Sequence, residues 1–192
     1  MSRNRIMLAA ICFLLFLGAI AAISSHSSQQ PLAAKVTISE TDLIRDYKSW
    51  TRVNPVPALV LARIAELCAD IRAVQAKSGP HADKYITVYV NDVGRHAMMS
   101  EKVPLFPQGS MIVKEKLPAV DSSPELLTAM IKREPGYNPQ SGDWEYMVLD
   151  GTAQTVRERG KLTTCQSCHI MEKDTDYVSR NYLPNDILQA LR

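Results

Sequence analysis

The segment Cys165-Gln166-Ser167-Cys168-His169, near the C-terminus, constrains the fold of this 192-residue chain more than any other feature. Its Cys-x-x-Cys-His spacing is typical of covalent haem attachment. On a helical turn, positions i, i+3 and i+4 lie on one side, so both thiols and the imidazole can face the same flat macrocycle. The spacing therefore predicts a haem-binding helical turn, in which Cys165 and Cys168 form thioether bonds and His169 ligates the iron.

Three other interpretations of the cysteine pair are weaker. A zinc site needs two further ligands, but there is no second cysteine pair, and His81 and His96 are distant in sequence. A thioredoxin-like redox pair belongs to a βαβ unit, and no such pattern precedes the motif. A disulfide that closes across two residues is strained. Covalent haem is therefore the prediction.

The place of the motif in the chain indicates the kind of haem site. Only 23 residues follow His169, and the one methionine among them, Met171, is too close in sequence to reach the opposite face of a haem. Methionines upstream could serve as a sixth ligand, but methionine is more often a core residue; they are Met98, Met99, Met111, Met130 and Met147. The sequence therefore predicts an open iron site, which binds or transforms small molecules.

The N-terminal end has the pattern of an export signal. Arg3 and Arg5 precede a run over residues 6–23 that contains no charged side chain and ends in small residues. This pattern predicts a bacterial-type signal peptide over residues 1–22. An uncleaved membrane anchor is the alternative, because the run approaches the roughly 20 residues of a spanning helix. In both cases the rest of the chain is expected in the periplasm or otherwise outside the cytoplasm.

We expect a flexible linker over residues 23–38 and a single domain over residues 39–192. Once Arg3 and Arg5 are set aside, 20 basic residues are balanced by 20 acidic ones. A neutral domain has no electrostatic footprint for nucleic acid, so that class of partner is excluded from the prediction.

Hydrophobic periodicity predicts a mixture of helices and strands. Apolar residues at intervals of three or four favour helices, and runs of β-branched and aromatic residues favour strands. A third helix is predicted from Ser123-Pro124-Glu125, which offers an N-cap, a proline at the first helical position and an acid in the first turn. The expected helices are 39–50, 60–77 and 123–133, and the expected strands are 85–90, 110–117 and 144–149. Together these elements predict one α+β domain.

Five segments outside the cysteine motif form a wider pattern: Tyr47-Lys48-Ser49-Trp50, Thr87-Val88-Tyr89-Val90, the stretch 106–115, Gly142-Asp143-Trp144-Glu145-Tyr146 and Asp174-Thr175-Asp176-Tyr177-Val178. With the C-terminal Cys-x-x-Cys-His, this pattern resembles the cytochrome P-460 family over nearly the whole mature chain. The resemblance implies a mainly antiparallel β-sheet with flanking helices, a periplasmic location and a homodimer. The four-helix cytochromes c′ also have a C-terminal motif, but they lack the strands predicted here.

The resemblance also implies a role for one lysine. The best-known members oxidise hydroxylamine, and their haem carries an additional covalent link to a lysine that follows a Phe-Pro-x-Gly turn. Lys114 occupies that position in this sequence. Strand alternation places Ile112, Lys114 and Lys116 on one face, which is compatible with a lysine held against the edge of a haem.

Two positions depart from the family pattern. The hydroxylamine-oxidising members have an arginine at the start of the Thr-Val-Tyr-Val strand, where this chain has Ile86. They also have a carboxylate shortly after the haem histidine, where this chain has Met171, with Glu172 one residue further on. Glu172 is therefore the candidate base for substrate protons, and it depends on turning toward the pocket.

Two functions from different classes follow. The first is an oxidoreductase in which Cys165, Cys168 and His169 hold a five-coordinate haem, Lys114 is linked to it, and Glu172 accepts protons. This protein would remove electrons from hydroxylamine or a related small nitrogen species and pass them to a periplasmic electron acceptor. The second is a non-catalytic protein that binds nitric oxide or carbon monoxide, similar to cytochrome c′-β, whose β-rich members lack the lysine link. A linked Lys114 favours the first function, and an unlinked haem favours the second.

Overall fold

The computed structural model describes residues 39–60 and 83–192, and every structural statement below refers to these residues. The expected signal peptide and linker lie outside them, and so do His81 and all but the first residue of the expected helix 60–77. That first residue, Val60, ends a strand. Among the helices in the described ranges, none is both long and apolar enough to cross a membrane.

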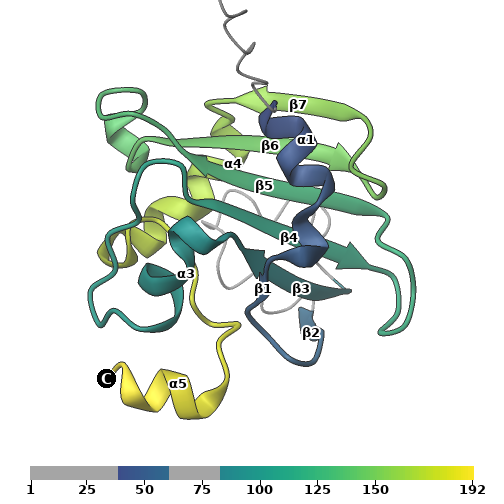
Figure 1. Ribbon diagram of the computed structural model, residues 1–192, viewed down its shortest axis with the longest axis horizontal. Coiled ribbons are helices and arrows are strands. Elements are labelled where there is room, and N and C mark those ends of the chain that lie inside the picture. The colour runs from purple at the N-terminus through teal and green to yellow at the C-terminus, as the bar shows by residue number, and fades with distance from the viewer. Residues whose placement is uncertain (1–38, 61–82) are drawn as a thin grey trace, which may run out of the picture. The chain divides into compact units, whose positions relative to one another are not determined.

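The described residues form one antiparallel β-sheet (Figure 1). Its strands are β1 (Thr51–Arg52), β2 (Ala58–Val60), β3 (Lys84–Val90), β4 (Met111–Leu117), β5 (Leu126–Lys132), β6 (Trp144–Asp150) and β7 (Val156–Gly160). Their order in the sheet is β1-β3-β4-β5-β6-β7, and β2 pairs with β3 beside β1. The predicted α+β class with a mainly antiparallel sheet is confirmed.

The helices are short and flank the sheet. They are α1 (Glu40–Arg45), α3 (Asp92–Met99), α4 (Thr163–His169) and α5 (Asn185–Ala190), with 3-10 turns at Tyr47–Ser49, Pro139–Ser141 and Ile170–Thr175. α1 lies across one face of the sheet (Figure 1). Ser39 caps it, because its hydroxyl accepts a hydrogen bond from the Asp42 N–H at 3.1 Å. Asn91 caps α3 in the same way through the Gly94 N–H.

Alternation along the strands divides the core into two clusters, one on each face of the sheet. The cluster under α1, called here the α1-side cluster, comprises Ile44, Tyr47, Met111, Val113, Leu127, Ala129, Ile131, Met147, Leu149 and Ala153. The cluster on the other face, called here the motif-side cluster, comprises Val53, Ile86, Val88, Val90, Ala97, Met98, Phe106, Ile112, Met130, Trp144, Tyr146, Val178 and Leu183. Cys165 packs against the motif-side cluster, so the cysteine motif belongs to the face opposite α1.

Two arginines and two glutamates fasten α1 to the sheet. Arg133 and Arg159 each pair with both Glu40, at the start of α1, and Glu145, in β6. The Arg159 Nε donates to Glu145 at 2.8 Å, and the Arg133 Nε donates to the same carboxylate at 2.7 Å. Because Glu145 is 6% exposed, these bonds compensate a carboxylate that has lost most of its water.

The predicted helix 123–133 is wrong, because residues 126–132 form β5. This strand pairs with β4 and β6 along its whole length, with Lys114 opposite Thr128 and Lys132 opposite Trp144. Apolar residues occupy both of its faces, so the sequence lacks the polar and apolar alternation that identifies a half-buried strand. The proline and acid that suggested a helix start lie in the turn that precedes the strand.

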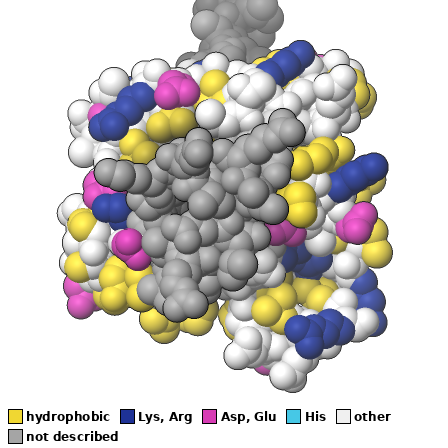
Figure 2. Space-filling view, turned by 180° about the vertical axis from the view of Figure 1, so that it is seen from behind, with side chains coloured by type: hydrophobic (Ala, Val, Ile, Leu, Met, Phe, Trp, Pro, Cys, Tyr) yellow, Lys and Arg dark blue, Asp and Glu magenta, His cyan; other side chains and the backbone are white. Residues whose placement is uncertain are grey.

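Other parts of the fold differ from the predictions. The helix expected over 39–50 ends at Arg45 and continues as a 3-10 turn, and β1, β2, α3, β7 and α5 were not predicted. The strands expected at 85–90, 110–117 and 144–149 are confirmed as β3, β4 and β6 within a residue or so. Viewed from behind, acidic and basic side chains are interspersed among hydrophobic ones over the visible described surface (Figure 2), in keeping with the balanced charge of the chain.

Candidate haem site

The cysteine motif lies on α4, directly after β7. The helix spans Thr163–His169, so the spacing of Cys165, Cys168 and His169 brings them to one side of a single helical turn. Cys165 is half-buried, Cys168 is exposed, and neither is in a disulfide. Burial raises the pKa of the Cys165 thiol, and the nearby charge of Lys116 opposes that shift. The two thiols are thus free to react with a common partner.

The structure holds His169 in the tautomer that a metal ligand requires. Its Nδ1 lies 2.7 Å from the Tyr177 carbonyl oxygen. A carbonyl can only accept a hydrogen bond, so Nδ1 carries the proton and Nε2 keeps a free lone pair. Burial, together with the charge of Lys114, lowers the pKa of His169 to about 4, so the ring is neutral near pH 7. The Tyr146 ring lies beside the imidazole, with the ring centroids 5.4 Å apart.

Two lysines of β4 point to the same side of the sheet as His169. Lys114 is half-buried, and its Nζ lies 5.0 Å from the centre of the Tyr182 ring. Lys116 is 2% exposed, and its ammonium makes no hydrogen bond or ion pair with any residue that the structure describes. Burial, followed by the charge of Lys114, lowers the pKa of Lys116 to about 8. Sequence reasoning placed Lys116 on this face but gave no sign that it is the more buried of the two.

The residues at the two departures from the family pattern have different surroundings. Ile86 is fully buried in the motif-side cluster. Met171 is 77% exposed. Glu172 is half-buried, and its side chain makes no hydrogen bond or ion pair within the described part of the chain. The structure therefore joins Glu172 to neither His169 nor the two lysines of β4 by a side-chain hydrogen bond or ion pair.

The upstream methionines are core residues. Met98 and Met130 lie in the motif-side cluster, and Met99 packs against it. Met111 and Met147 lie in the α1-side cluster, on the opposite face of the sheet from the cysteine motif. These two methionines therefore cannot reach an iron bound by His169.

The structure also bears on the zinc alternative. His96 is exposed and lies 3.8 Å from a Glu101 carboxylate oxygen, away from the motif. Over residues 39–60 and 83–192, no group of three or more histidine, cysteine, aspartate or glutamate side chains could hold a metal ion.

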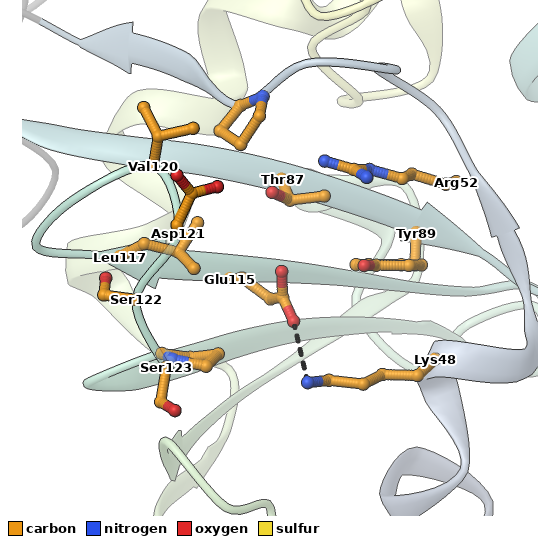
Figure 3. A pocket seen from close by; sticks show the side chains of 12 residues that line it. Lys48, Arg52, Thr87, Tyr89, Glu115, Leu117, Val120, Asp121, Ser122 and Ser123 are labelled. Atoms are coloured by element: carbon orange, nitrogen blue, oxygen red, sulfur yellow. Dashed lines mark ion pairs between the residues drawn. The ribbon is translucent and has the colours of Figure 1, made fainter.

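A polar cleft of about 270 Å³ lies on the other face of the sheet (Figure 3). At its floor, the Glu115 carboxylate accepts a hydrogen bond from the Tyr47 hydroxyl at 2.6 Å and lies 3.8 Å from the Lys48 ammonium. Glu115 and Lys114 are consecutive on β4, so their side chains point to opposite faces. The cleft is therefore separate from the cysteine motif.

The helical turn on this antiparallel sheet presents two free thiols and a neutral imidazole on one side. This arrangement is typical of proteins that bind a prosthetic group. A family model, Cytochrome P-460, matches residues 66–180, which is more than half of the chain. The chain therefore belongs to the cytochrome P-460 family, and it is a haem-binding protein of the c-type class. No individual curated protein matches it.

The residues of the site fit a haem. The thiols of Cys165 and Cys168 are unpaired, and the Nε2 of His169 has no competing hydrogen-bond partner among the described residues. A neutral imidazole whose other nitrogen donates to a carbonyl is the usual state of a histidine that ligates a metal. Apolar and aromatic side chains of the motif-side cluster pack around the turn, as a macrocycle of this kind requires.

Proposed function

We propose that this chain is an exported c-type haem protein that oxidises hydroxylamine or a related small nitrogen species at an open iron site. The observation that carries the proposal is the arrangement of α4, where two free thiols and a neutral imidazole lie on one helical turn. The inward-facing Lys114 and Lys116 support it, because both stand on the face that this turn occupies.

Covalent attachment uses the two cysteines of the turn. Each thiol would add across one vinyl group of the haem, so that a sulfur–carbon bond would form and the thiol hydrogen would move to the neighbouring vinyl carbon. The addition needs no oxidant, because no electrons leave the pair of reactants. Cys165 and Cys168 are both unpaired and lie one helical turn apart, which is what this reaction requires.

The remaining site residues hold and tune the group. When bound, the haem supplies an iron that takes a small ligand and accepts its electrons. His169 would offer Nε2 to that iron, while its Nδ1 donates a hydrogen bond to the Tyr177 carbonyl. Lys114, half-buried on the same face, would lie against the haem edge, the position in which the family places its linked lysine. A periplasmic electron acceptor and a homodimeric state belong to the proposal.

One observation favours the second candidate, a non-catalytic protein that binds nitric oxide or carbon monoxide. Oxidation of hydroxylamine releases protons, and a positioned base accelerates such steps. Glu172, the candidate base, has no side-chain hydrogen bond or ion pair among the described residues that would orient it toward a substrate. Nitric oxide and carbon monoxide carry no proton, so their binding needs no base.

The optical spectrum of the purified, dithionite-reduced protein separates the two functions. A linked Lys114 predicts a Soret band well to the red of an ordinary c-type haem, and Lys114→Ala should restore the ordinary position. Lys116→Ala is the matched control, because it removes the neighbouring lysine on the same face and should leave the red shift intact. An ordinary five-coordinate spectrum in the unaltered protein would instead support diatomic ligand binding. Turnover of hydroxylamine is the assay that follows a red-shifted spectrum.

A further inference from the structure

The carbonyl that holds His169 belongs to an unusual stretch of backbone. Asp176 and Tyr177 have φ angles of 53° and 64°, so two consecutive residues with side chains adopt the left-handed conformation. Each such residue is strained relative to the right-handed form, because its Cβ crowds the backbone. The surroundings must therefore hold this turn, which presents the Tyr177 carbonyl to the imidazole.

Asp176 supplies the contacts that hold the turn. It is 9% exposed, and its carboxylate oxygens lie 2.6 and 2.7 Å from the Lys132 ammonium. The Phe106 N–H donates to the same carboxylate at 2.9 Å. The Trp144 indole N–H donates to the Asp176 carbonyl at 2.7 Å. Both the side chain and the backbone of Asp176 are thus bound to the sheet and to the loop before β4.

The partners of Asp176 are themselves fixed. Lys132 and Trp144 stand opposite each other on β5 and β6, and the Lys132 ammonium lies 5.0 Å from the centre of the indole ring. Trp144 is fully buried and packs edge-on against Phe106, with ring centroids 5.5 Å apart. The turn therefore rests on two central strands and has little freedom to move.

We propose that Asp176 is a positioning residue for His169: it locks the left-handed turn whose Tyr177 carbonyl accepts the hydrogen bond from Nδ1. The inference rests on the proposed role of His169 as the iron ligand. It assigns a task to a segment, Asp174 to Val178, that resembled the family pattern but had no function in the sequence analysis.

The proposal has a measurable electronic consequence. A hydrogen bond from Nδ1 to a carbonyl raises the basicity of a ligating imidazole. When the turn relaxes, that bond weakens, and the imidazole donates less electron density to the iron. The iron–histidine stretching frequency of the reduced protein should then fall, and the reduction potential should rise.

The test uses the haem-loaded, full-length protein and resonance Raman spectroscopy of its reduced form. Asp176→Asn and Trp144→Phe should both lower the iron–histidine stretching frequency. Trp144→Phe changes no charge and keeps an aromatic ring, so it remains informative if Asp176→Asn fails to fold. Asp174→Asn is the matched control, because this exposed aspartate lies in the same segment and its side chain makes no hydrogen bond among the described residues; it should leave the frequency unchanged.

Lys132→Met distinguishes positioning from simple electrostatics. Removal of a positive charge near an iron, by itself, lowers the reduction potential. The oxidised iron carries the larger positive charge, so it gains more from the loss of a nearby cation than the reduced iron does. The positioning role predicts that the reduction potential rises instead. Without the Lys132 ammonium the turn at Asp176 relaxes, and His169 donates less electron density to the iron. A potential that falls in Lys132→Met while the Raman frequency stays unchanged in Asp176→Asn and Trp144→Phe overturns the inference. A protein without haem, or a spectrum unaltered by His169→Ala, overturns the proposed function and the inference with it.

Discussion

At the residue scale, Gly142 and the turn at Asp176 and Tyr177 depend on each other. Gly142 has φ 61°, and a Cβ built on it would lie 2.5 Å from the Tyr177 ring and 2.9 Å from an Asp176 carboxylate oxygen. Contacts this short force the turn to shift. The glycine is needed both for its left-handed backbone and for the space that it leaves.

Gly142→Ala should therefore destabilise the protein more than the same substitution at a left-handed glycine with open space around it. The expected loss in the free energy of unfolding is about 2–3 kcal/mol, measured by urea denaturation. Gly136→Ala is the control, because Gly136 has φ 92° but nothing within 4 Å of its built Cβ. It should lose only the backbone cost of about 1 kcal/mol. Equal losses in the two variants would contradict the close packing of Gly142 against the turn.

Single residues also show where sequence reasoning ends. Cys165, Cys168 and His169 lie within five consecutive positions, so their spacing alone predicts that they share a surface. The residues that support them are remote in sequence: Lys132 and Asp176 are 44 positions apart and meet only because β5 and the C-terminal segment pack together. No local signal predicts a contact of this kind. Nor does one predict the left-handed conformation of Asp176 and Tyr177, neither of which is a glycine.

At the scale of elements, strands were predictable where their composition was distinctive. β3 and β6 are rich in β-branched and aromatic residues, and β4 is bounded by Gly109 and Pro118, so their positions followed from the sequence. β5 was mistaken for a helix because its two apolar faces show no period of two, and only pairing with β4 and β6 decides its conformation. α3, which begins at the Asn91 cap directly after β3, was not predicted.

The attachment of α1 to the sheet should depend on pH. Burial alone would raise the pKa of Glu40 and Glu145, but the hydrogen bonds and charges of Arg133 and Arg159 outweigh it and lower both pKa values. A carboxyl group with a lowered pKa in the folded state contributes stability above its unfolded pKa. That contribution is lost as the pH falls through the folded value.

We therefore expect the free energy of unfolding to fall as the pH decreases from roughly 5 to 3. Glu40→Gln should reduce stability at pH 7 by about 1 kcal/mol and make the fall with acid shallower. Glu134→Gln is the control, since Glu134 is exposed and has no ion pair among the described residues. An unchanged pH dependence in Glu40→Gln would contradict the role given to this ion-pair group.

At the scale of the whole molecule, the sheet separates two chemically different faces. One face carries α1, the α1-side cluster and the polar cleft around Glu115. The other carries the cysteine motif, His169 and the two lysines of β4. Because neighbouring residues on a strand point to opposite faces, a single strand, β4, supplies Lys114 to one side and Glu115 to the other. A haem held by the cysteine motif would therefore lie on the motif side of the sheet.

The central claim is that haem is bound covalently through Cys165 and Cys168. The most direct test is the intact mass of the purified protein in denaturing acid, after expression in a host that exports and attaches c-type haem. The measured mass should equal that of the mature polypeptide plus one haem. The mass of the haem should be missing when both cysteines are changed to serine. A polypeptide that gives up its haem in acid, or never carried one, would contradict the account.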